Sequence, residues 1–233
     1  MRSRRRSVAP TMRVEVWSDV VCPWCYIGKR NLESALAGFE HADEVEVVWR
    51  SFELDPGAPA RREGSYVERL ARKYRTPVDE AQAMIDRMTA SAAAVGLDLR
   101  FDLAQPGSTF DAHRLLHRAA EHGVQGAVKE RLLRATFTEG EPIGDRETLV
   151  RLAGDVGLDA DEVRGVLASD AHADAVRAEE AEAATLDIAG VPFFVVDRTY
   201  GISGAHPPDA LRRILTKAWA RSHPPALVVD DPR

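Results

Sequence analysis

The chain has 233 residues, of which 45% are hydrophobic and 29% charged, a balance that excludes a disordered or fibrous protein. Its formal net charge of -6 comes from 31 basic and 37 acidic residues, which excludes a broad basic surface for nucleic acid or anionic lipid. No stretch is apolar for long enough to span a bilayer. We therefore expect a globular protein of the cytoplasm, with no nucleic-acid or membrane partner.

The two ends of the chain differ in composition from the rest. Residues 1–11 are rich in arginine, but the apolar core that a secretory signal requires does not follow them. We interpret residues 1–11 as a disordered basic arm. Residues 223–233 contain adjacent prolines and adjacent aspartates, and we expect them to form a flexible tail.

The first regular element is a strand that leads into a helix through the motif Cys22-Pro23-Trp24-Cys25. Residues 13–17 alternate polar and apolar side chains, as a half-buried strand does, and residues 27–39 repeat apolar side chains at helical spacing. Pro23 suits the first turn of a helix because it has no N–H to leave unpaired. The motif is therefore expected to lie at a helix N-terminus.

Cys22 and Cys25 are the only cysteines in the chain. Structural disulfides are rare in a reducing compartment, so two closely spaced cysteines there indicate redox chemistry. A zinc site would need further ligands, and although His113 and His117 could share a helix face, no second cysteine pair accompanies them. We predict no metal site.

The expected helix start gives the two cysteines different roles. Free N–H groups and the positive end of the helix dipole stabilise a thiolate, so Cys22 is predicted to be the exposed nucleophile. Cys25 lies one turn further in, is expected to be more buried, and would be the resolving thiol. Trp24 between them is large enough to shield both sulfurs from water.

The remaining elements follow from residue patterns further along the chain. Residues 45–52 form a second β-rich run, and from about residue 62 to 187 apolar side chains recur at helical spacing. Strand signals return at residues 191–196 and 200–205, and a helix is expected to begin at the prolines near residue 207. The predicted order is strand, helix, strand, a long helical segment, then strand, strand, helix.

The sequence around the cysteine motif, residues 17–29, resembles the DsbA family, and specifically its FrnE-like branch of predicted dithiol-disulfide isomerases. Four further segments resemble that branch in the same order, namely residues 109–115, 137–140, 190–195 and 200–205. The resemblance covers nearly the whole chain after residue 12. A mechanism that uses two cysteine pairs is excluded because this chain has only one.

The resemblance implies an α/β protein with a thioredoxin fold and a large α-helical insertion. Residues 12–60 and 188–222 would form the two parts of the thioredoxin-like domain, and residues 61–187 the helical insertion domain. It also implies a cis peptide bond between Val191 and Pro192, placed opposite the cysteines. The backbone of Val191 would then be an edge with which an extended substrate pairs.

Three other ionisable side chains are candidates for roles at the site. Asp19 precedes Cys22 by three residues and could tune the thiols, and Glu15 could do so from the first strand, beneath the helix. Simpler interpretations are a turn or cap residue for Asp19 and a solvent-facing strand residue for Glu15. His113 would be a substrate-side residue if its helix covers the motif.

These features lead to a main hypothesis and an alternative. The first is a thiol-disulfide oxidoreductase or isomerase that acts through a mixed disulfide at Cys22. The alternative is a glutathione-dependent isomerase or transferase of the kappa or 2-hydroxychromene-2-carboxylate isomerase type, and a non-catalytic binding module is a third reading. We expect no bound cofactor, protein or small-molecule thiols and disulfides as substrates, and glutathione, another thiol or the thioredoxin system as redox partner. The direction of net electron flow, the reduction potential and the oligomeric state stay open.

Overall fold

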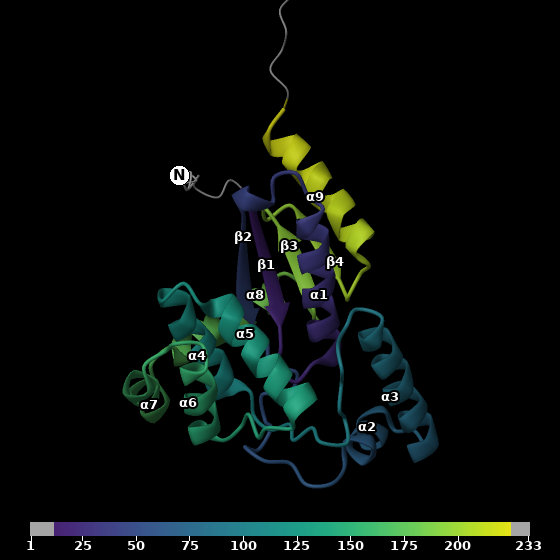
Figure 1. The fold of residues 1–233 in the computed structure, drawn as a ribbon, viewed down its shortest axis with the longest axis vertical. Coiled ribbons are helices and arrows are strands. Elements are labelled where there is room, and N and C mark those ends of the chain that lie inside the picture. Colours follow the sequence, from purple (N-terminus) through teal and green to yellow (C-terminus); the bar gives the residue numbers. More distant parts are fainter. Residues whose placement is uncertain (1–11, 225–233) are drawn as a thin grey trace, which may run out of the picture.

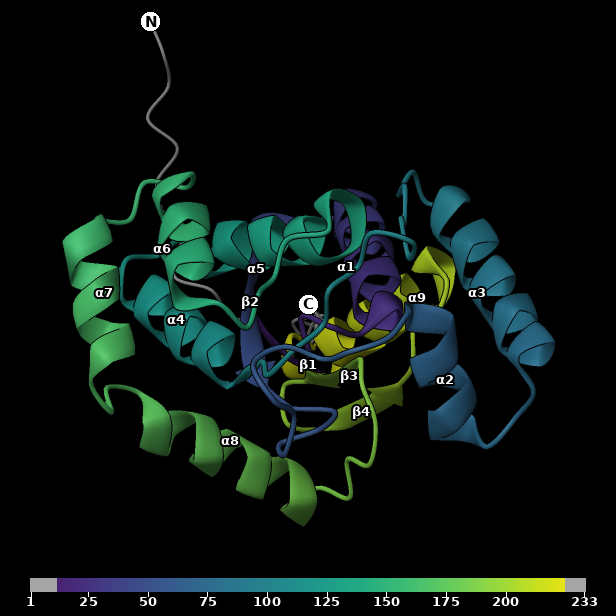
Figure 2. The same cartoon turned by 90° about the horizontal axis from the view of Figure 1, so that it is seen from below.

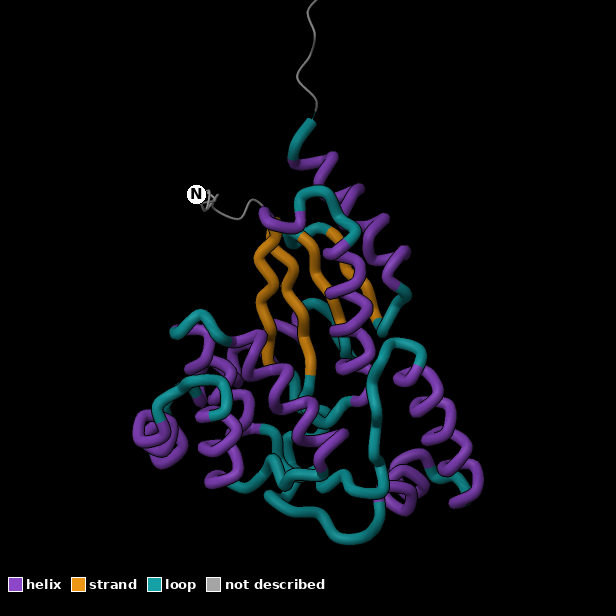
Figure 3. The backbone as a smooth tube through the Cα atoms, viewed as in Figure 1, coloured by secondary structure: helices purple, strands orange, loops and turns teal. Residues whose placement is uncertain are grey.

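The computed structural model describes residues 12–224, so the predicted basic arm and all but the first two residues of the predicted tail lie outside the described part of the chain. At its centre is one sheet in the order β2-β1-β3-β4 (Figures 1 and 3). The parallel pair is β1 and β2, whereas β3 is antiparallel to β1 and to β4. The strands are β1 (Met12–Ser18), β2 (Val45–Ser51), β3 (Phe193–Val196) and β4 (Tyr200–Ser203).

Both faces of this sheet are covered by helices. The side chains of Val14 and Val16 pack with residues of α1 (Pro23–Ala37) and α9 (Pro208–Ser222), whereas that of Trp17 packs with α8 (Ala173–Thr185) on the other face. Because side chains alternate along a strand, β1 contributes to two separate cores.

The long segment between β2 and β3 is helical and divides into two groups on opposite sides of α1 (Figures 1 and 2). One group is the hairpin of α2 (Tyr66–Tyr74) and α3 (Val78–Ala93), which packs against the start of α1. The other is a bundle with its own apolar core, formed by α4 (Phe110–Glu121), α5 (Gln125–Arg134), α6 (Arg146–Gly154) and α7 (Ala160–Ala168). A short 3-10 turn, η1 (Ala42–Glu44), precedes β2, and one π-helical turn, η2 (Ala135–Glu139), continues α5.

The predicted α/β fold, a thioredoxin fold with a large helical insertion, is confirmed. Two strands are shorter than predicted. β3 begins at Phe193 because Pro192 has no N–H to give the ladder. β4 ends at Ser203 because Gly204 takes a positive φ of 93° and turns the chain, donating its N–H to Pro192. Between residues 12 and 224, no helix combines the length and apolarity needed to cross a membrane.

Candidate active site

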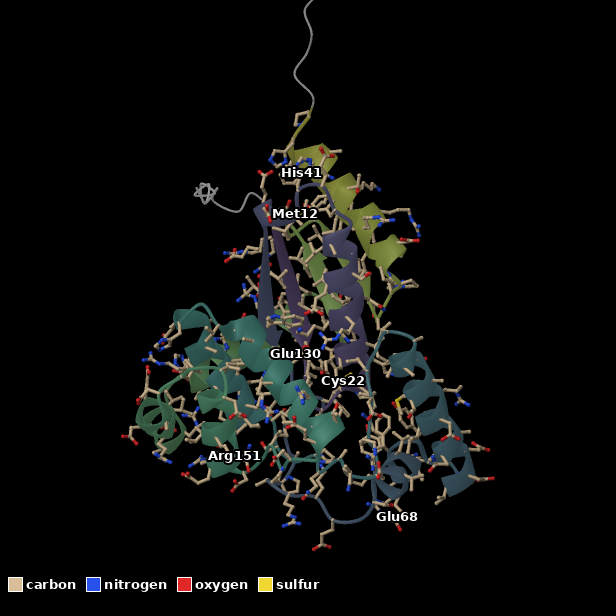
Figure 4. All side chains as sticks on the ribbon, in the orientation of Figure 1. Met12, Cys22, His41, Glu68, Glu130 and Arg151 are labelled. Carbon is tan, nitrogen blue, oxygen red and sulfur yellow. The ribbon has the colours of Figure 1, made fainter. Side chains whose placement is uncertain are left out.

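The two cysteines lie where β1 passes into α1. Cys22 caps the helix with an extended backbone, Pro23 occupies the first turn, and the Cys25 N–H donates to the Cys22 carbonyl, 3.0 Å away. In Figure 4, Cys22 lies at the end of α1 that faces the helical segment. The pair therefore lies at the N-terminus of α1, the positive end of the helix dipole, as the strand and helix patterns predict.

Access to the thiols is limited to one side. Cys22 is 4% exposed and Cys25 1%, so the open position expected for Cys22 is wrong, because the residues around the cavity cover it. Cys22 nevertheless lines a cavity of about 1290 Å³, and Cys25 does not. Trp24 also lines the cavity and is 40% exposed, so it flanks the sulfurs at the surface. A substrate that enters the cavity meets Cys22 first.

The loop before β3 brings a second backbone segment to Cys22. The peptide bond between Val191 and Pro192 is cis, as the resemblance implies. The Cys22 thiol donates to the carbonyl oxygen of Val191 across 3.4 Å, and Val191 lines the same cavity. Pro192 itself packs on Gly28 of α1, where a Cβ would lie only 2.9 Å from the Pro192 Cγ. Gly28 thus lets α1 approach this loop closely.

A lysine that the sequence analysis missed lies beneath the pair. Lys129 comes from α5, is fully buried, and donates from Nζ to the carbonyl oxygen of Ser18, 3.2 Å away. Its ammonium also lies 5.7 Å from the centre of the Trp49 ring. Burial lowers the pKa of Lys129 to about 8, although the negative charge of the nearby thiols favours the protonated form.

The two thiols differ in acidity in a way the sequence analysis did not anticipate. Burial raises the pKa of Cys25, but the hydrogen bond with Cys22 and the charge of Lys129 outweigh it, and the pKa is lowered. Hydrogen bonding with Cys25, together with burial, raises the pKa of Cys22 well above its usual value. Because ionisation of either sulfur opposes that of the other, the pair titrates in two steps, and the first negative charge is shared by the two sulfurs through their hydrogen bond.

Asp19 and His113 form a buried contact behind the cysteines. Asp19 lines the cavity, yet its side chain is fully covered, and its Oδ2 accepts a hydrogen bond from the Leu54 N–H at 2.8 Å. Its other oxygen lies 3.4 Å from His113 Nε2, close enough for attraction but without an aligned hydrogen bond. Burial raises the pKa of Asp19, but His113, the Leu54 N–H and Lys129 outweigh it, so the pKa is lowered.

His113 is not a substrate-side residue. It is completely buried, does not line the cavity, and directs its ring to Asp19. The role depended on a helix that covers the motif, whereas α4 packs in the bundle with α5, α6 and α7, and the His113 side chain meets Asp19 instead of the cavity.

Glu15 lies on the face of the sheet away from α1. It is 1% exposed and forms ion pairs with Arg50 and Arg198. Both expectations for Glu15 are therefore wrong, because alternation along β1 directs it away from the thiols and α8 covers that face as well.

The same buried network includes Glu179 of α8. Its carboxylate accepts from Arg50 at 2.7 Å and from the Ser51 N–H at 2.7 Å, and it lies 3.2 Å from His117 Nε2. Burial raises the pKa of Glu179, but these three donors, His117 foremost, outweigh it and lower the pKa to about 2. The network holds α4 and α8 to the end of β2. Within residues 12–224, no group of three or more His, Cys, Asp or Glu side chains could hold a metal ion.

Comparison with known proteins identifies the family. The family model described as the DSBA-like thioredoxin domain matches residues 13–216. The chain belongs to this DSBA-like family. Among its relatives, the uncharacterised protein YwbO of Bacillus subtilis (strain 168) is 30% identical over 208 residues, which cover 88% of this chain and 96% of YwbO.

Solved structures of DSBA-like proteins have the same fold. A probable DsbA oxidoreductase from Streptomyces coelicolor is 50% identical, with a TM-score of 0.87 over 93% of this chain and 94% of that one. The cytosolic disulfide reductase DsbM from Pseudomonas aeruginosa, solved with GSH, is 18% identical, with a TM-score of 0.62 over 88% and 98% of the two chains. The chain thus has the fold of DsbA-like thiol-disulfide oxidoreductases.

Proposed function

We propose that this DSBA-like protein exchanges thiols and disulfides through the Cys22-Pro23-Trp24-Cys25 motif. The observation that carries the proposal is the unequal placement of the two sulfurs. Cys22 borders the cavity beside the Val191 backbone, while Cys25 lies behind it and next to a buried ammonium. This arrangement supplies an attacking thiol and a resolving thiol in the order that disulfide exchange requires.

Exchange starts from the singly ionised pair, which holds one proton and one negative charge. The proton passes from Cys22 to the Cys25 sulfur, and the Cys22 thiolate attacks a substrate disulfide. A Cys22–substrate S–S bond forms, the substrate S–S bond breaks, and one substrate thiolate leaves. The substrate thiolate that left first takes the proton from Cys25. The Cys25 thiolate then attacks the Cys22 sulfur, which releases the second substrate thiolate. Two electrons have moved from the protein to the substrate.

The surroundings of the pair support each stage of this exchange. Ionisation of Cys22 removes the S–H that donates to Val191, which leaves the Val191 carbonyl free to accept from an extended substrate. Lys129 lies beside Cys25 and stabilises the thiolate that resolves the mixed disulfide. The same steps run in reverse when a substrate dithiol is oxidised.

The substrates we propose are thiols and disulfides of proteins or small molecules, exchanged in the cytoplasm without a bound cofactor. Glutathione, another thiol or the thioredoxin system would return the pair to its starting redox state. The likeness in fold to DsbM, a cytosolic disulfide reductase solved with GSH, supports this assignment. Isomerisation of wrongly paired disulfides uses the same mixed disulfide.

Trapping of the mixed disulfide tests the proposal. Cys25→Ser should accumulate a covalent adduct with a peptide disulfide, visible by mass spectrometry and released by dithiothreitol, because no resolving thiol remains. Cys22→Ser is the matched control and should form no adduct. Equal adduct formation at both cysteines would contradict the assigned roles.

The same variants separate the alternative function. A glutathione-dependent isomerase or transferase does not need a resolving thiol, so its turnover should survive in Cys25→Ser. The cavity beside Cys22 is compatible with this alternative, because it has room for glutathione and a small second substrate. Loss of all glutathione-dependent turnover in Cys25→Ser would exclude that alternative.

A further inference from the structure

The cavity beside Cys22 has a wall of positive charge. Six basic side chains line it, against the three acidic side chains of Asp19, Asp55 and Glu63. The basic residues are Arg61, Arg62, Arg69, Arg72, Lys73 and Arg87. The formal charge of the whole chain is -6, so this surface has the opposite sign to the protein that carries it.

Most of these cations are not neutralised by the protein itself. Arg62 forms an ion pair with Asp55, and Arg72 lies near enough to Glu68 to lower the pKa of that carboxyl, but in the described part of the chain Arg61, Arg72 and Arg87 form no ion pair within 4 Å. Burial and the nearby charges of Arg62 and Arg72 lower the pKa of Arg69, which donates to backbone carbonyls instead of to an acid. A ligand with carboxylates would relieve this repulsion.

The charged wall is close to the reacting sulfur. Tyr66 opens α2, and burial together with the charge of Cys22 raises its pKa, so the start of this helix lies within the electrostatic reach of the thiol. Between the cations, the side chains of Leu54, Leu70 and Met88 give the cavity an apolar floor. The Val191 backbone borders the same cavity beside Cys22.

We propose, on the basis of the thiol-disulfide exchange proposed above, that this cavity binds an extended acidic peptide segment whose Asp or Glu residues flank the reacting cysteine. The Val191 edge would pair with the peptide backbone, and the arginines of α2 and α3 would bind its carboxylates. A volume of about 1290 Å³ exceeds the roughly 300–1000 Å³ of most small-molecule sites, which favours a segment of several residues.

The test compares two peptide disulfides that differ only in charge, with Glu or Gln on both sides of the cysteine. Reduced protein should be oxidised about tenfold faster by the Glu peptide at low salt, and the difference should shrink as salt is added. In the double variant Arg72→Gln/Arg87→Gln the preference should fall below about threefold. Both residues are exposed, and within residues 12–224 neither forms an ion pair within 4 Å, so the fold should be unaffected.

Two controls separate specificity from chemistry. Arg213→Gln/Arg221→Gln removes the same charge from exposed positions on α9, at the far end of the molecule from α2 and α3, and should keep the full preference (Figure 1). Hydroxyethyl disulfide carries no charge, so its rate with each of the three proteins measures the reactivity of the thiols, and dividing the peptide rates by it isolates the charge preference. Its failure to react with any of them would contradict disulfide exchange itself, not the charge preference.

Binding gives a readout that does not depend on exchange. A Glu peptide with serine in place of cysteine should bind the unmodified protein more tightly than its Gln counterpart, and the Arg72→Gln/Arg87→Gln variant should lose this difference. Equal binding and equal rates for the two peptides would overturn the proposal. If glutathione disulfide oxidised the protein as fast as the Glu peptide, and slowed as much in the Arg72→Gln/Arg87→Gln variant, an extended peptide segment would be overturned as the occupant of the cavity.

Discussion

The Nζ of Lys129 donates to the carbonyl oxygen of Ser18 from 3.2 Å, and no carboxylate of the described residues forms an ion pair with it. A buried charge without a counterion is costly. The anions that Lys129 faces are the Asp19 carboxylate and the thiolate of the reduced cysteine pair, and oxidation to a disulfide removes the second of these. Lys129 therefore favours the reduced pair over the oxidised one.

Lys129→Met should raise the lower pKa of the thiol pair by about one unit, because the stabilising charge is lost at nearly constant side-chain volume. Alkylation by iodoacetamide near pH 7 should slow about tenfold, and the rate measured against pH gives the shift directly. Lys217→Met, on the exposed side of α9, is the charge-matched control. An unchanged titration in Lys129→Met would show that the ammonium does not act on the thiols.

Asp19→Asn should have the opposite effect. The Asp19 carboxylate raises the pKa of Cys22, whereas an asparagine can still accept from the Leu54 N–H. The thiol pair should therefore become more acidic, with alkylation at about pH 6 several-fold faster than in the unmodified protein. Asp209→Asn on α9 controls for net charge. Slower alkylation in Asp19→Asn would instead indicate that the carboxylate helps to remove the thiol proton.

Gly28→Ala should impair exchange through packing alone. The new Cβ would lie 2.9 Å from Pro192 and 3.3 Å from Phe194, so the loop that carries Val191 must move away from Cys22. We expect about a tenfold slower reaction with peptide disulfides and a loss of about 1–3 kcal/mol in unfolding free energy. Gly165→Ala is the matched control, because a Cβ there meets nothing within 4 Å and should stabilise its helix. Full activity in Gly28→Ala would contradict this account.

Glu179→Gln should destabilise the protein in a pH-dependent way. The pKa of Glu179 is about 2 in the folded protein against 4.5 ordinarily, so its stabilising contribution is complete above pH 4.5 and disappears as pH falls through 2. Urea unfolding should show a loss of about 3 kcal/mol at neutral pH and about 1 kcal/mol near pH 3. A pH-independent loss would indicate that shape, and not charge, accounts for the effect.

The sequence predicts the local parts of the site well. The strand before Cys22 and the helix after it follow from side-chain alternation and helical spacing, which involve only neighbouring residues. Glu15 was misjudged because alternation shows which residues share a face but not that α8 covers the second face. His113 was expected on the substrate side but is buried against Asp19, because helical spacing does not show against which element a helix packs.

Lys129 could not be linked to the cysteines from local patterns, since it reaches them from a helix far along the chain. A signal was nevertheless present. Lys129 shares a face of α5 with Leu132 and Leu133, three and four residues further on, and both are fully buried. A lysine within an apolar stripe is a candidate for a buried charge, and only the tertiary structure shows what it faces.

The hairpin of α2 and α3 lies on the opposite side of α1 from the bundle of α4 to α7, although its apolar side chains share a core with Leu133 and Phe137 (Figure 2). Redox chemistry depends on α1 and α5, whereas the charge of the cavity wall depends on this hairpin and the loop before it. The two properties are thus encoded in separate stretches of sequence. In evolution or in protein engineering, substitutions at Arg72 and Arg87 can change which disulfides are accepted while the cysteine pair on α1 and the buried lysine on α5 stay the same.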